Sequence, residues 1–281
     1  MLTIKHQALL LSLVVSTSIA VFPQTASAAT PAHLSWALDI ESHVAPENND
    51  YATSPSYIHW AGSDGATIYE NRTVCATFVT AVLMQAYGWD THYFQNWMGT
   101  NSPSAAVYYA AIVAKKGFTK INSVTGIQPG DLVAIKFPNG SYVTGHMMTA
   151  TAVPIFHPAT KPIINGTTQW EVPIVDSSRS YHGPGDTRLL PDGSIDRGVG
   201  QGSIRIYTDS NGVYKGYTWS ADSGSLYHST STRPIAVGRL QNVPGIADTP
   251  NDEDDEDDED DAIESRDPDL DGDDSDPEPE L

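Results

Sequence analysis

The chain ends in a run of carboxylates that cannot bury a hydrophobic core. Residues 249–281 contain 19 acidic residues and a single basic one, Arg266, and so carry −18 of the formal net charge of −20. Because these charges repel one another and apolar residues are scarce, we expect this acidic tail to stay unfolded. Folding is therefore confined to the preceding residues, which are close to neutral.

The first 28 residues have the composition of a secretory signal peptide. Lys5 precedes an apolar run over residues 8–22, and Ala26 and Ala28 have the spacing of a cleavage site. The run is too short and too interrupted by serine for a stable membrane span, although an uncleaved anchor is the alternative. We therefore expect a secreted or periplasmic protein, without a membrane span once the signal peptide is removed.

Residues 29–248 are long enough for one domain, and they contain the single cysteine of the chain, Cys75. In an oxidising compartment cysteine usually forms a disulfide, which a lone cysteine cannot do within its own chain. Cys75 is therefore either a small buried hydrophobic residue or a functional thiol.

Cys75 is expected in the first turn of a helix. Apolar residues recur with helical spacing over residues 74–86, Gly88 provides a stop, and Asn71 or Thr73 can cap the start. A thiol at this place lies near unpaired N–H groups and the positive end of the helix dipole, which lower its pKa. The same N–H groups can bind an oxyanion, so the position has both properties that a nucleophile needs.

The hydrophobic period changes after a second predicted helix, which Ser102 caps and Gly117 ends. Alternating segments then predict strands over residues 131–137, 142–153, 170–175, 198–207 and 213–219. Helices followed by strands predict an α+β fold, in which N-terminal helices pack on an antiparallel sheet.

Three short segments resemble the NlpC/P60 and CHAP cysteine peptidases, which are papain-like hydrolases. They are Val74-Cys75-Ala76-Thr77-Phe78-Val79 at the helix start, Gln128-Pro129-Gly130-Asp131-Leu132-Val133 opening a hairpin, and Gly145-His146-Met147-Met148 on its return. The resemblance implies that Cys75 is the nucleophile and His146 the general base. It places the third, orienting residue on the next strand, where Asp176 stands, with His182 as the alternative.

Other polar residues are candidates for substrate binding. Tyr69 precedes the nucleophile, where it either binds substrate and assists the oxyanion or is a core aromatic residue. A loop rich in polar residues and glycine, residues 176–188, follows the expected catalytic strand and contains His182. In the same loop, Arg188 either clamps a substrate carboxylate or forms an internal ion pair with Asp186.

These features predict an exported cysteine hydrolase that cleaves amide bonds through a thioester. Export and the resemblance together favour peptides of the cell wall (peptidoglycan) as the substrate. The alternatives are a secreted or surface binding protein with an inactive papain-like fold, and an acyltransferase that uses the same Cys–His pair. No cofactor motif and no zinc-ligand spacing is present in the sequence, and the lack of a basic patch argues against a nucleic-acid partner.

The acidic tail has one further pattern. Asp267, Asp269, Asp271 and Glu278 match the spacing of a calcium-binding loop around Gly272. In a segment this rich in aspartate such a match arises easily by chance. We therefore expect weak, diffuse binding of divalent cations by the tail, with the specific calcium site as the alternative.

Overall fold

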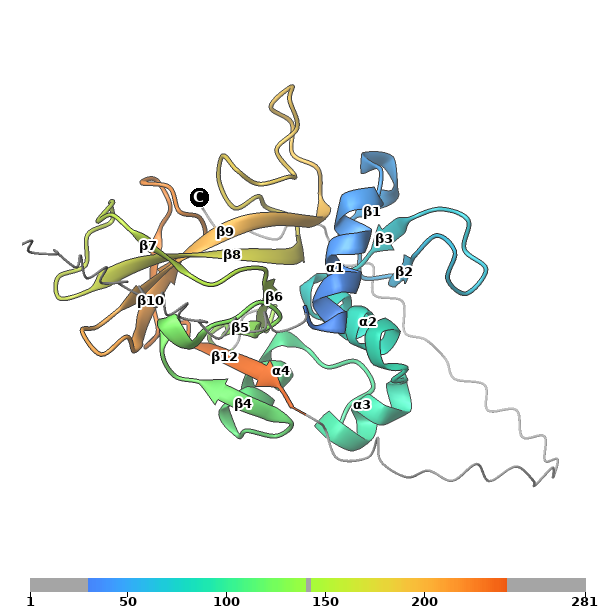
Figure 1. Ribbon diagram of the computed structural model, residues 1–281, viewed down its shortest axis with the longest axis horizontal. Coiled ribbons are helices and arrows are strands. Elements are labelled where there is room, and N and C mark those ends of the chain that lie inside the picture. Colours follow the sequence, from blue (N-terminus) through green and yellow to red (C-terminus); the bar gives the residue numbers. More distant parts are fainter. Residues whose placement is uncertain (1–29, 140–142, 242–281) are drawn as a thin grey trace, which may run out of the picture.

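The computed structural model describes residues 30–139 and 143–241, in which the four α-helices precede the strands of the large sheet and a small three-stranded sheet lies between α1 and α2 (Figure 1). The helices are α1 (Ala32–His43), α2 (Cys75–Tyr87), α3 (Thr91–Met98) and α4 (Ala105–Val113), with 3₁₀ helices η1 (Pro46–Asn48) and η2 (Val124–Gly126). A small sheet has the order β1-β3-β2 and is formed by β1 (Asn49–Asp50), β2 (Tyr57–His59) and β3 (Glu70–Arg72).

The remaining strands form one large antiparallel sheet. They are β4 (Phe118–Ile121), β5 (Leu132–Lys136), β6 (Gly145–Ala150), β7 (Ile155–His157), β8 (Thr168–Ser178), β9 (Gly198–Thr208), β10 (Tyr214–Thr218), β11 (Tyr227–Ser229) and β12 (Ile235–Leu240). Their order is β11-β10-β9-β8-β6-β5-β12-β4, and β7 pairs with β8. Four mainly N-terminal helices packed with an antiparallel sheet confirm the predicted α+β class.

The first predicted helix is confirmed, but its cap is not the expected one. Helix α2 begins at Cys75 and ends before Gly88, whose φ of 68° gives the left-handed conformation that glycine adopts without strain. Val74 is the N-cap, and its N–H donates to the Thr77 hydroxyl at 3.0 Å. Thr73 cannot cap the helix because its hydroxyl instead donates to the Asn71 amide oxygen at 2.6 Å.

The second predicted helix starts later than expected. Helix α4 begins at Ala105 with Ser104 as its N-cap, rather than with Ser102. Ser102 is held in a preceding turn, where its N–H donates to the Thr100 hydroxyl at 3.3 Å. The predicted start was therefore wrong by two residues, and the predicted stop at Gly117 was also wrong, since α4 ends at Val113 with Ala114 as its C-cap.

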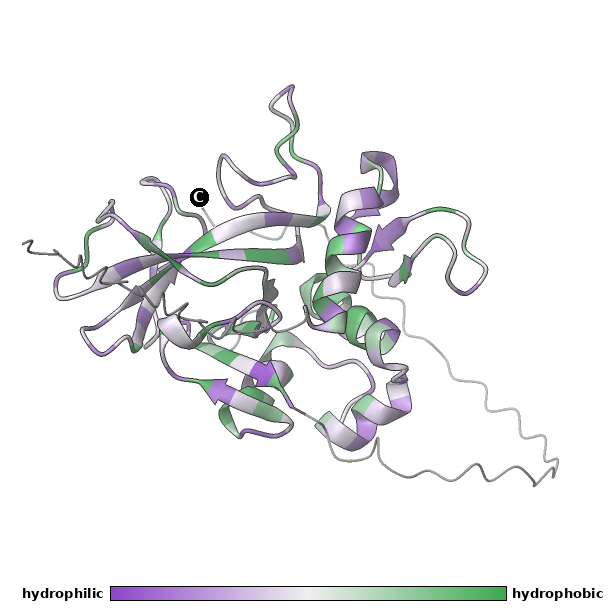
Figure 2. Ribbon diagram, in the orientation of Figure 1, coloured by the Kyte–Doolittle hydropathy of each residue, from purple (hydrophilic) through white to green (hydrophobic). Residues whose placement is uncertain are grey.

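The large sheet is buried on both faces because its strands alternate between two cores. Leu132 and Ala134 of β5 face the first core, which the four helices cover, whereas Val133 and Ile135 face the second core. Helix α2 is hydrophobic along most of its length (Figure 2), as expected for a helix that lies in the first core. This burial fixes α2 against the sheet, and with it the position of Cys75.

The two ends of the large sheet approach each other around the second core. The Val124 N–H of η2 donates to the carbonyl oxygen of Gly212, in the turn between β9 and β10, at 3.2 Å. The Tyr214 hydroxyl of β10 donates to the carbonyl oxygen of Ile121, at the end of β4, at 3.1 Å. The sheet is therefore strongly curved, and the second core lies inside the curve.

Several predictions fall on residues outside the described ranges. They are the signal peptide (1–28), the acidic tail (249–281) and the calcium-loop spacing within that tail. Among the described helices, none combines the length and the apolarity that crossing a bilayer requires.

Candidate active site

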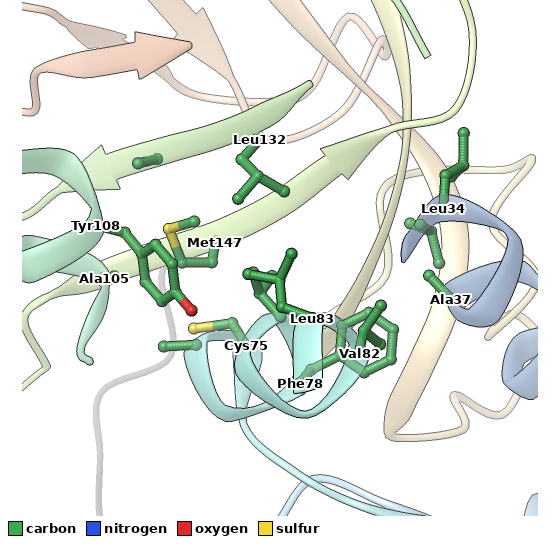
Figure 3. Close-up of a cluster of buried hydrophobic side chains, with 14 of the residues drawn as sticks. Leu34, Ala37, Cys75, Phe78, Val82, Leu83, Ala105, Tyr108, Leu132 and Met147 are labelled. Carbon is green, nitrogen blue, oxygen red and sulfur yellow. The ribbon is translucent and has the colours of Figure 1, made fainter. Parts of the chain in front are cut away.

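Cys75 lies where α2 meets the sheet, at the edge of the first core. Figure 3 shows it on the first turn of α2, beside Leu83, Tyr108 and Met147. Only 6% of the residue is exposed, and its Sγ lies 4.0 Å from the Gly145 carbonyl oxygen of β6. Cys75 is thus a free thiol that borders both the hydrophobic core and the polar residues of β6.

His146 is presented to Cys75 by an unusual backbone turn. Gly145 directly before it has a φ of 152°, and a Cβ at this position would lie 1.9 Å from the Ile135 carbonyl oxygen. Glycine is therefore required at residue 145. The His146 Nε2 donates to Asp176 Oδ2 at 2.5 Å, and the ring lies close enough to the Cys75 thiol for each side chain to shift the pKa of the other.

The two side chains shift each other's proton affinity in opposite directions. Burial alone would raise the pKa of the Cys75 thiol, but the charge and hydrogen bond of His146, together with the backbone N–H of Met147, lower that pKa overall. Burial alone would lower the pKa of His146, but Cys75 and Asp176 raise it to about 9. Both shifts favour transfer of the Cys75 proton to His146, toward a thiolate–imidazolium pair.

Asp176, in β8, is the hub of the polar cluster. Its side chain is fully buried and accepts hydrogen bonds from His146, from His182 Nε2 at 3.0 Å and from the Arg188 guanidinium. Burial would raise the pKa of this carboxyl, but Arg188, His182 and His146 hold it well below its usual range. Of the two predicted candidates for the orienting residue, Asp176 touches His146 and His182 lies behind Asp176.

Arg188 points into the cluster rather than toward a substrate. It is 1% exposed, and its guanidinium bonds Asp186, Asp176 and the backbone carbonyl oxygens of Asp176, Gly198 and Gly200. Of the two alternatives for Arg188, a substrate clamp or an internal ion pair with Asp186, the structure has the ion pair, at 2.9 Å. All its donors face acceptors inside the protein, so Arg188 has none left for a substrate carboxylate.

Tyr69 is the one predicted site residue that the fold does not bring to Cys75. Its ring stacks on His43 of α1, with centroids 4.8 Å apart, and the Asp39 carboxylate lies near its hydroxyl. Burial and this carboxylate raise the pKa of Tyr69. Tyr69 thus packs against the outer side of the first core, as the core alternative for this residue described.

Two aromatic residues of the site lie outside the predicted set of site residues, although Trp219 ends the strand expected over residues 213–219, where its ring was expected in the core or at the cleft. Burial together with the charge of the nearby Cys75 raises the pKa of the Tyr51 hydroxyl, so its proton stays in place. Trp219, which follows β10, contacts both His146 and His182, with ring centroids 4.6 Å and 4.5 Å away. Neither residue stands near Cys75 in the sequence, and Tyr51 has no local pattern that marks it.

A glycine pattern in β9 was also missed, although it is visible in the sequence. Gly198, Gly200 and Gly202 alternate, so they share one face of the strand. A Cβ on Gly200 would lie 2.7 Å from the Arg188 side chain, and one on Gly202 would lie 2.6 Å from an Asp186 carboxylate oxygen. The glycines leave the space that the polar cluster fills.

His146, Asp176 and His182 also have the residue types of a metal site. Their ligand atoms lie within 4.8 Å of one another. In this geometry, however, the two imidazoles bond the carboxylate directly, and the Arg188 guanidinium lies on its other oxygen. A permanent cation thus already balances the carboxylate, and a divalent ion between these groups would be repelled by Arg188.

Comparison with known proteins gives one informative relative. The chain is 33% identical over 221 residues to the uncharacterized protein R653 of Acanthamoeba polyphaga mimivirus, a match that covers 75% of this chain and 96% of the relative. No protein-family model matches the chain. No solved structure matches it either.

Proposed function

We propose that this chain, which belongs to the same family as the mimivirus protein R653, is a cysteine hydrolase that cleaves amide bonds through a thioester. The observation that carries the proposal is the grouping of Cys75, His146 and Asp176: His146 bonds Asp176 at 2.5 Å, the pKa of Cys75 is lowered by His146, and the pKa of His146 is raised by Cys75 and Asp176. A nucleophile at a helix start, a histidine on the sheet and an acid on the neighbouring strand is also the order of the papain-like NlpC/P60 and CHAP families. The geometry therefore supports the papain-like fold that this resemblance implies.

The residues provide each step of the reaction. The Cys75 thiolate attacks the carbonyl carbon, and the Tyr51 hydroxyl and the N–H groups of the first turn of α2 are donors for the oxyanion. His146 then gives its proton to the leaving amine as the C–N bond breaks, which leaves a thioester on Cys75. A water molecule, deprotonated by His146, hydrolyses the thioester and restores the thiol.

The Cys75–His146 pair predicts that alkylation of Cys75 and turnover of substrate depend differently on pH. Because the pKa of Cys75 is lowered, iodoacetamide should modify Cys75 at pH 6, well below the ordinary thiol pKa of about 8.5. The His146 imidazolium is lost as the pH rises through about 9, so turnover, which needs this acid, should fall there while alkylation continues. Mass spectrometry of the modified protein across pH 4–10 measures the first quantity, and an amide-hydrolysis assay measures the second.

His146→Gln is the control for that experiment. Since the charge of His146 is the largest effect that lowers the pKa of Cys75, this variant should require a higher pH for alkylation than the wild type. A Cys75 that reacts only after unfolding would contradict the proposal and return the residue to a core role.

Cell-wall peptides are the substrates that we propose. The predicted export and the NlpC/P60 resemblance support this choice, and residues of the site do not decide it. Purified wall fragments incubated with the protein and analysed by mass spectrometry should show a gain of one water at a single amide bond. If the fragments stay intact while Cys75 is reactive, the hydrolase proposal stands and cell-wall peptides are ruled out as its substrate.

Arg179 gives a prediction about the charge of the reacting molecule. It is exposed, its guanidinium lies 5.5 Å from the Tyr51 ring centroid, and no carboxylate in the described ranges pairs with it. The anion iodoacetate should therefore gain from Arg179 in a way that neutral iodoacetamide does not. Arg179→Gln should lower the iodoacetate-to-iodoacetamide rate ratio at Cys75 by roughly threefold to tenfold at low salt, as expected for one partly screened charge.

The matched control is Arg233→Gln. Arg233 also lies over an aromatic ring, that of Phe137 at 4.7 Å, but it belongs to the loop before β12. It should leave the rate ratio unchanged. An equal fall in both variants would show that only the net charge of the protein matters.

A further inference from the structure

We propose that Ser177 is a positioning residue, which sets the distance between the Cys75 thiol and the two residues of the sheet that act with it. Those residues are His146 of β6 and Asp176 of β8. Ser177 does so through a buried hydrogen bond to the segment before α2, and this bond continues into a network of uncharged side chains. The network belongs to the folded chain, whereas its effect on turnover rests on the proposed function.

Ser177 directly follows Asp176 in β8, and successive residues of a strand point to opposite faces. The Asp176 carboxylate faces the polar cluster, where His146 donates to it. The Ser177 hydroxyl instead donates to the Thr73 carbonyl oxygen at 2.7 Å, and both residues are buried. Thr73 stands two residues before Cys75. A buried hydrogen bond thus joins the strand of the acid to the segment that leads into the nucleophile.

Thr73 is also held by side chains of the small sheet. Its hydroxyl donates to the Asn71 amide oxygen at 2.6 Å, and the Asn71 amide nitrogen donates to the Asn49 amide oxygen at 2.9 Å. Asn49 and Asn71 face each other in the parallel pair of β1 and β3, and both are buried. Thr73 is therefore fixed twice, because Ser177 bonds its backbone and Asn71 bonds its side chain.

The network ends on β9, directly opposite Ser177. Asn49 bonds both backbone groups of Val199: its amide oxygen accepts the Val199 N–H at 2.8 Å, and its amide nitrogen donates to the Val199 carbonyl oxygen at 2.9 Å. Val199 is the partner of Ser177 in the register of β8 and β9. A Cβ on Gly198 would lie 2.2 Å from the Asn49 amide oxygen, so glycine leaves the space for this contact. The segment before α2 is thus tied to two adjacent strands of the large sheet.

The bonds that run from Ser177 to Asn49 involve only hydroxyl, amide and backbone groups. A carboxylate meets the network only at its far end, where Asp196 accepts the Asn49 amide at 3.1 Å. Removing the Ser177 hydroxyl therefore changes the geometry of the site without changing its charge. Reacting groups that are misplaced by on the order of 1 Å can lose roughly a hundredfold in rate, so this geometry matters for turnover.

A longer distance between Cys75 and His146 has an effect of known sign on each of them. His146 lowers the pKa of Cys75, and Cys75 raises the pKa of His146. If the two side chains move apart, both effects weaken, so the pKa of Cys75 rises and that of His146 falls. The other titratable or charged groups around the pair are not replaced in a Ser177 variant; they are Tyr51, Asp176, Arg179, His182 and Arg188. The pH range for turnover should therefore narrow from both sides.

The test compares Ser177→Ala with Ser178→Ala in the full-length protein. Ser178 is the next residue of β8, is also buried, and its hydroxyl also has a backbone partner, since it accepts the Ser180 N–H at 3.1 Å. In Ser177→Ala, iodoacetamide should require a higher pH to modify Cys75 than in the wild type, and turnover should end at a lower pH. Its kcat should fall by roughly tenfold to a hundredfold. Ser178→Ala should leave both pH limits and kcat close to those of the wild type.

The two pH limits separate a positioning role from a loss of stability. Both profiles are recorded well below the midpoint of thermal unfolding of each variant. Partial unfolding reduces the amount of active protein but does not move the pH limits of the molecules that stay folded. A Ser177→Ala protein that loses stability while keeping both wild-type limits would therefore overturn the positioning role.

A second pair of variants applies if Ser177→Ala does not fold. Thr73→Val removes the hydroxyl that donates to Asn71 at nearly constant shape, whereas Thr73→Ser keeps a hydroxyl there. Thr73→Val should narrow the pH range in the same way, and Thr73→Ser should largely restore it. The same pH limits in both variants would overturn the role of the network.

The outcomes also separate this proposal from the proposed function. A wild-type Cys75 that reacts only after unfolding would contradict the hydrolase, and the role of Ser177 in turnover would fail with it. A reactive Cys75 whose pH limits are the same in Ser177→Ala and in the wild type would contradict the positioning role alone.

Discussion

Replacing Cys75 with alanine is expected to abolish amide hydrolysis, with a fall in kcat on the order of 10⁶, the effect of removing the nucleophile from a catalytic triad. His146→Gln should cost nearly as much, because the residues act as a unit and either loss prevents thioester formation. The assay is the release of product from wall fragments or from an amide substrate found in that screen. Circular dichroism and thermal unfolding of each variant show that the fold is kept.

His33→Gln is the matched control for His146→Gln. His33 is as buried as His146, with 4% of the residue exposed against 5%. Its ring nitrogens bond the Tyr87 hydroxyl and the Gly130 carbonyl oxygen, neither of which belongs to the group of Cys75, His146 and Asp176. It should lower stability while retaining most of the turnover of the remaining folded protein. If Cys75→Ala keeps the activity, Cys75 is not the nucleophile and the proposed mechanism is wrong.

The second large effect concerns stability. Arg188→Met should destabilise the protein by about 3–5 kcal/mol, because it leaves the buried carboxylates of Asp176 and Asp186 without their shared cation. For a domain of this size the midpoint of thermal unfolding should fall by roughly 10 °C or more. Scanning calorimetry at pH 7 measures this change.

Lys215→Met is the comparison variant. Lys215 pairs with Asp209 at 3.0 Å, but about half of the lysine side chain is exposed, so its loss should cost less than about 1 kcal/mol. An Arg188→Met protein as stable as Lys215→Met would show that the cluster is not held by this arginine. In that case the buried charges would need a different explanation.

The sequence predicted the parts of the site that depend on local patterns. The helix at Cys75 followed from its apolar spacing and from Gly88, and the strands carrying His146 and Asp176 followed from alternation and turns. A residue can be placed from the sequence when its own helix or strand fixes its position. Cys75, His146 and Asp176 are of this kind, so their order along the chain predicted the order of the site residues.

The remainder of the site depends on contacts between distant segments. Tyr51 reaches Cys75 from the end of β1, and Trp219 reaches His146 from the end of β10, and neither approach has a local signature. Arg188 was open to two interpretations, because only the packing of β9 against its loop shows that the side chain turns inward.

Two helices were also missed, for different reasons. Helix α3 has a capping aspartate, since Asp90 accepts the Tyr93 N–H at 2.7 Å, so its start was readable in the sequence. Helix α1 starts without a side-chain cap after Pro31, although its buried residues Leu34, Ala37 and Ile40 recur with helical spacing. It packs on α2.

The three glycines of β9 imply a trade-off between robustness and activity. A glycine inside a strand typically lowers stability by roughly 0.5–1 kcal/mol relative to alanine, and here that penalty occurs three times on one face of a strand. The eleven residue pairs between β8 and β9 offset it. Substitutions with higher strand preference, the usual route to a hardier protein, would at Gly200 or Gly202 displace the charges that orient Asp176. Efforts to make this protein more heat-resistant should therefore leave β9 untouched and begin elsewhere on the sheet.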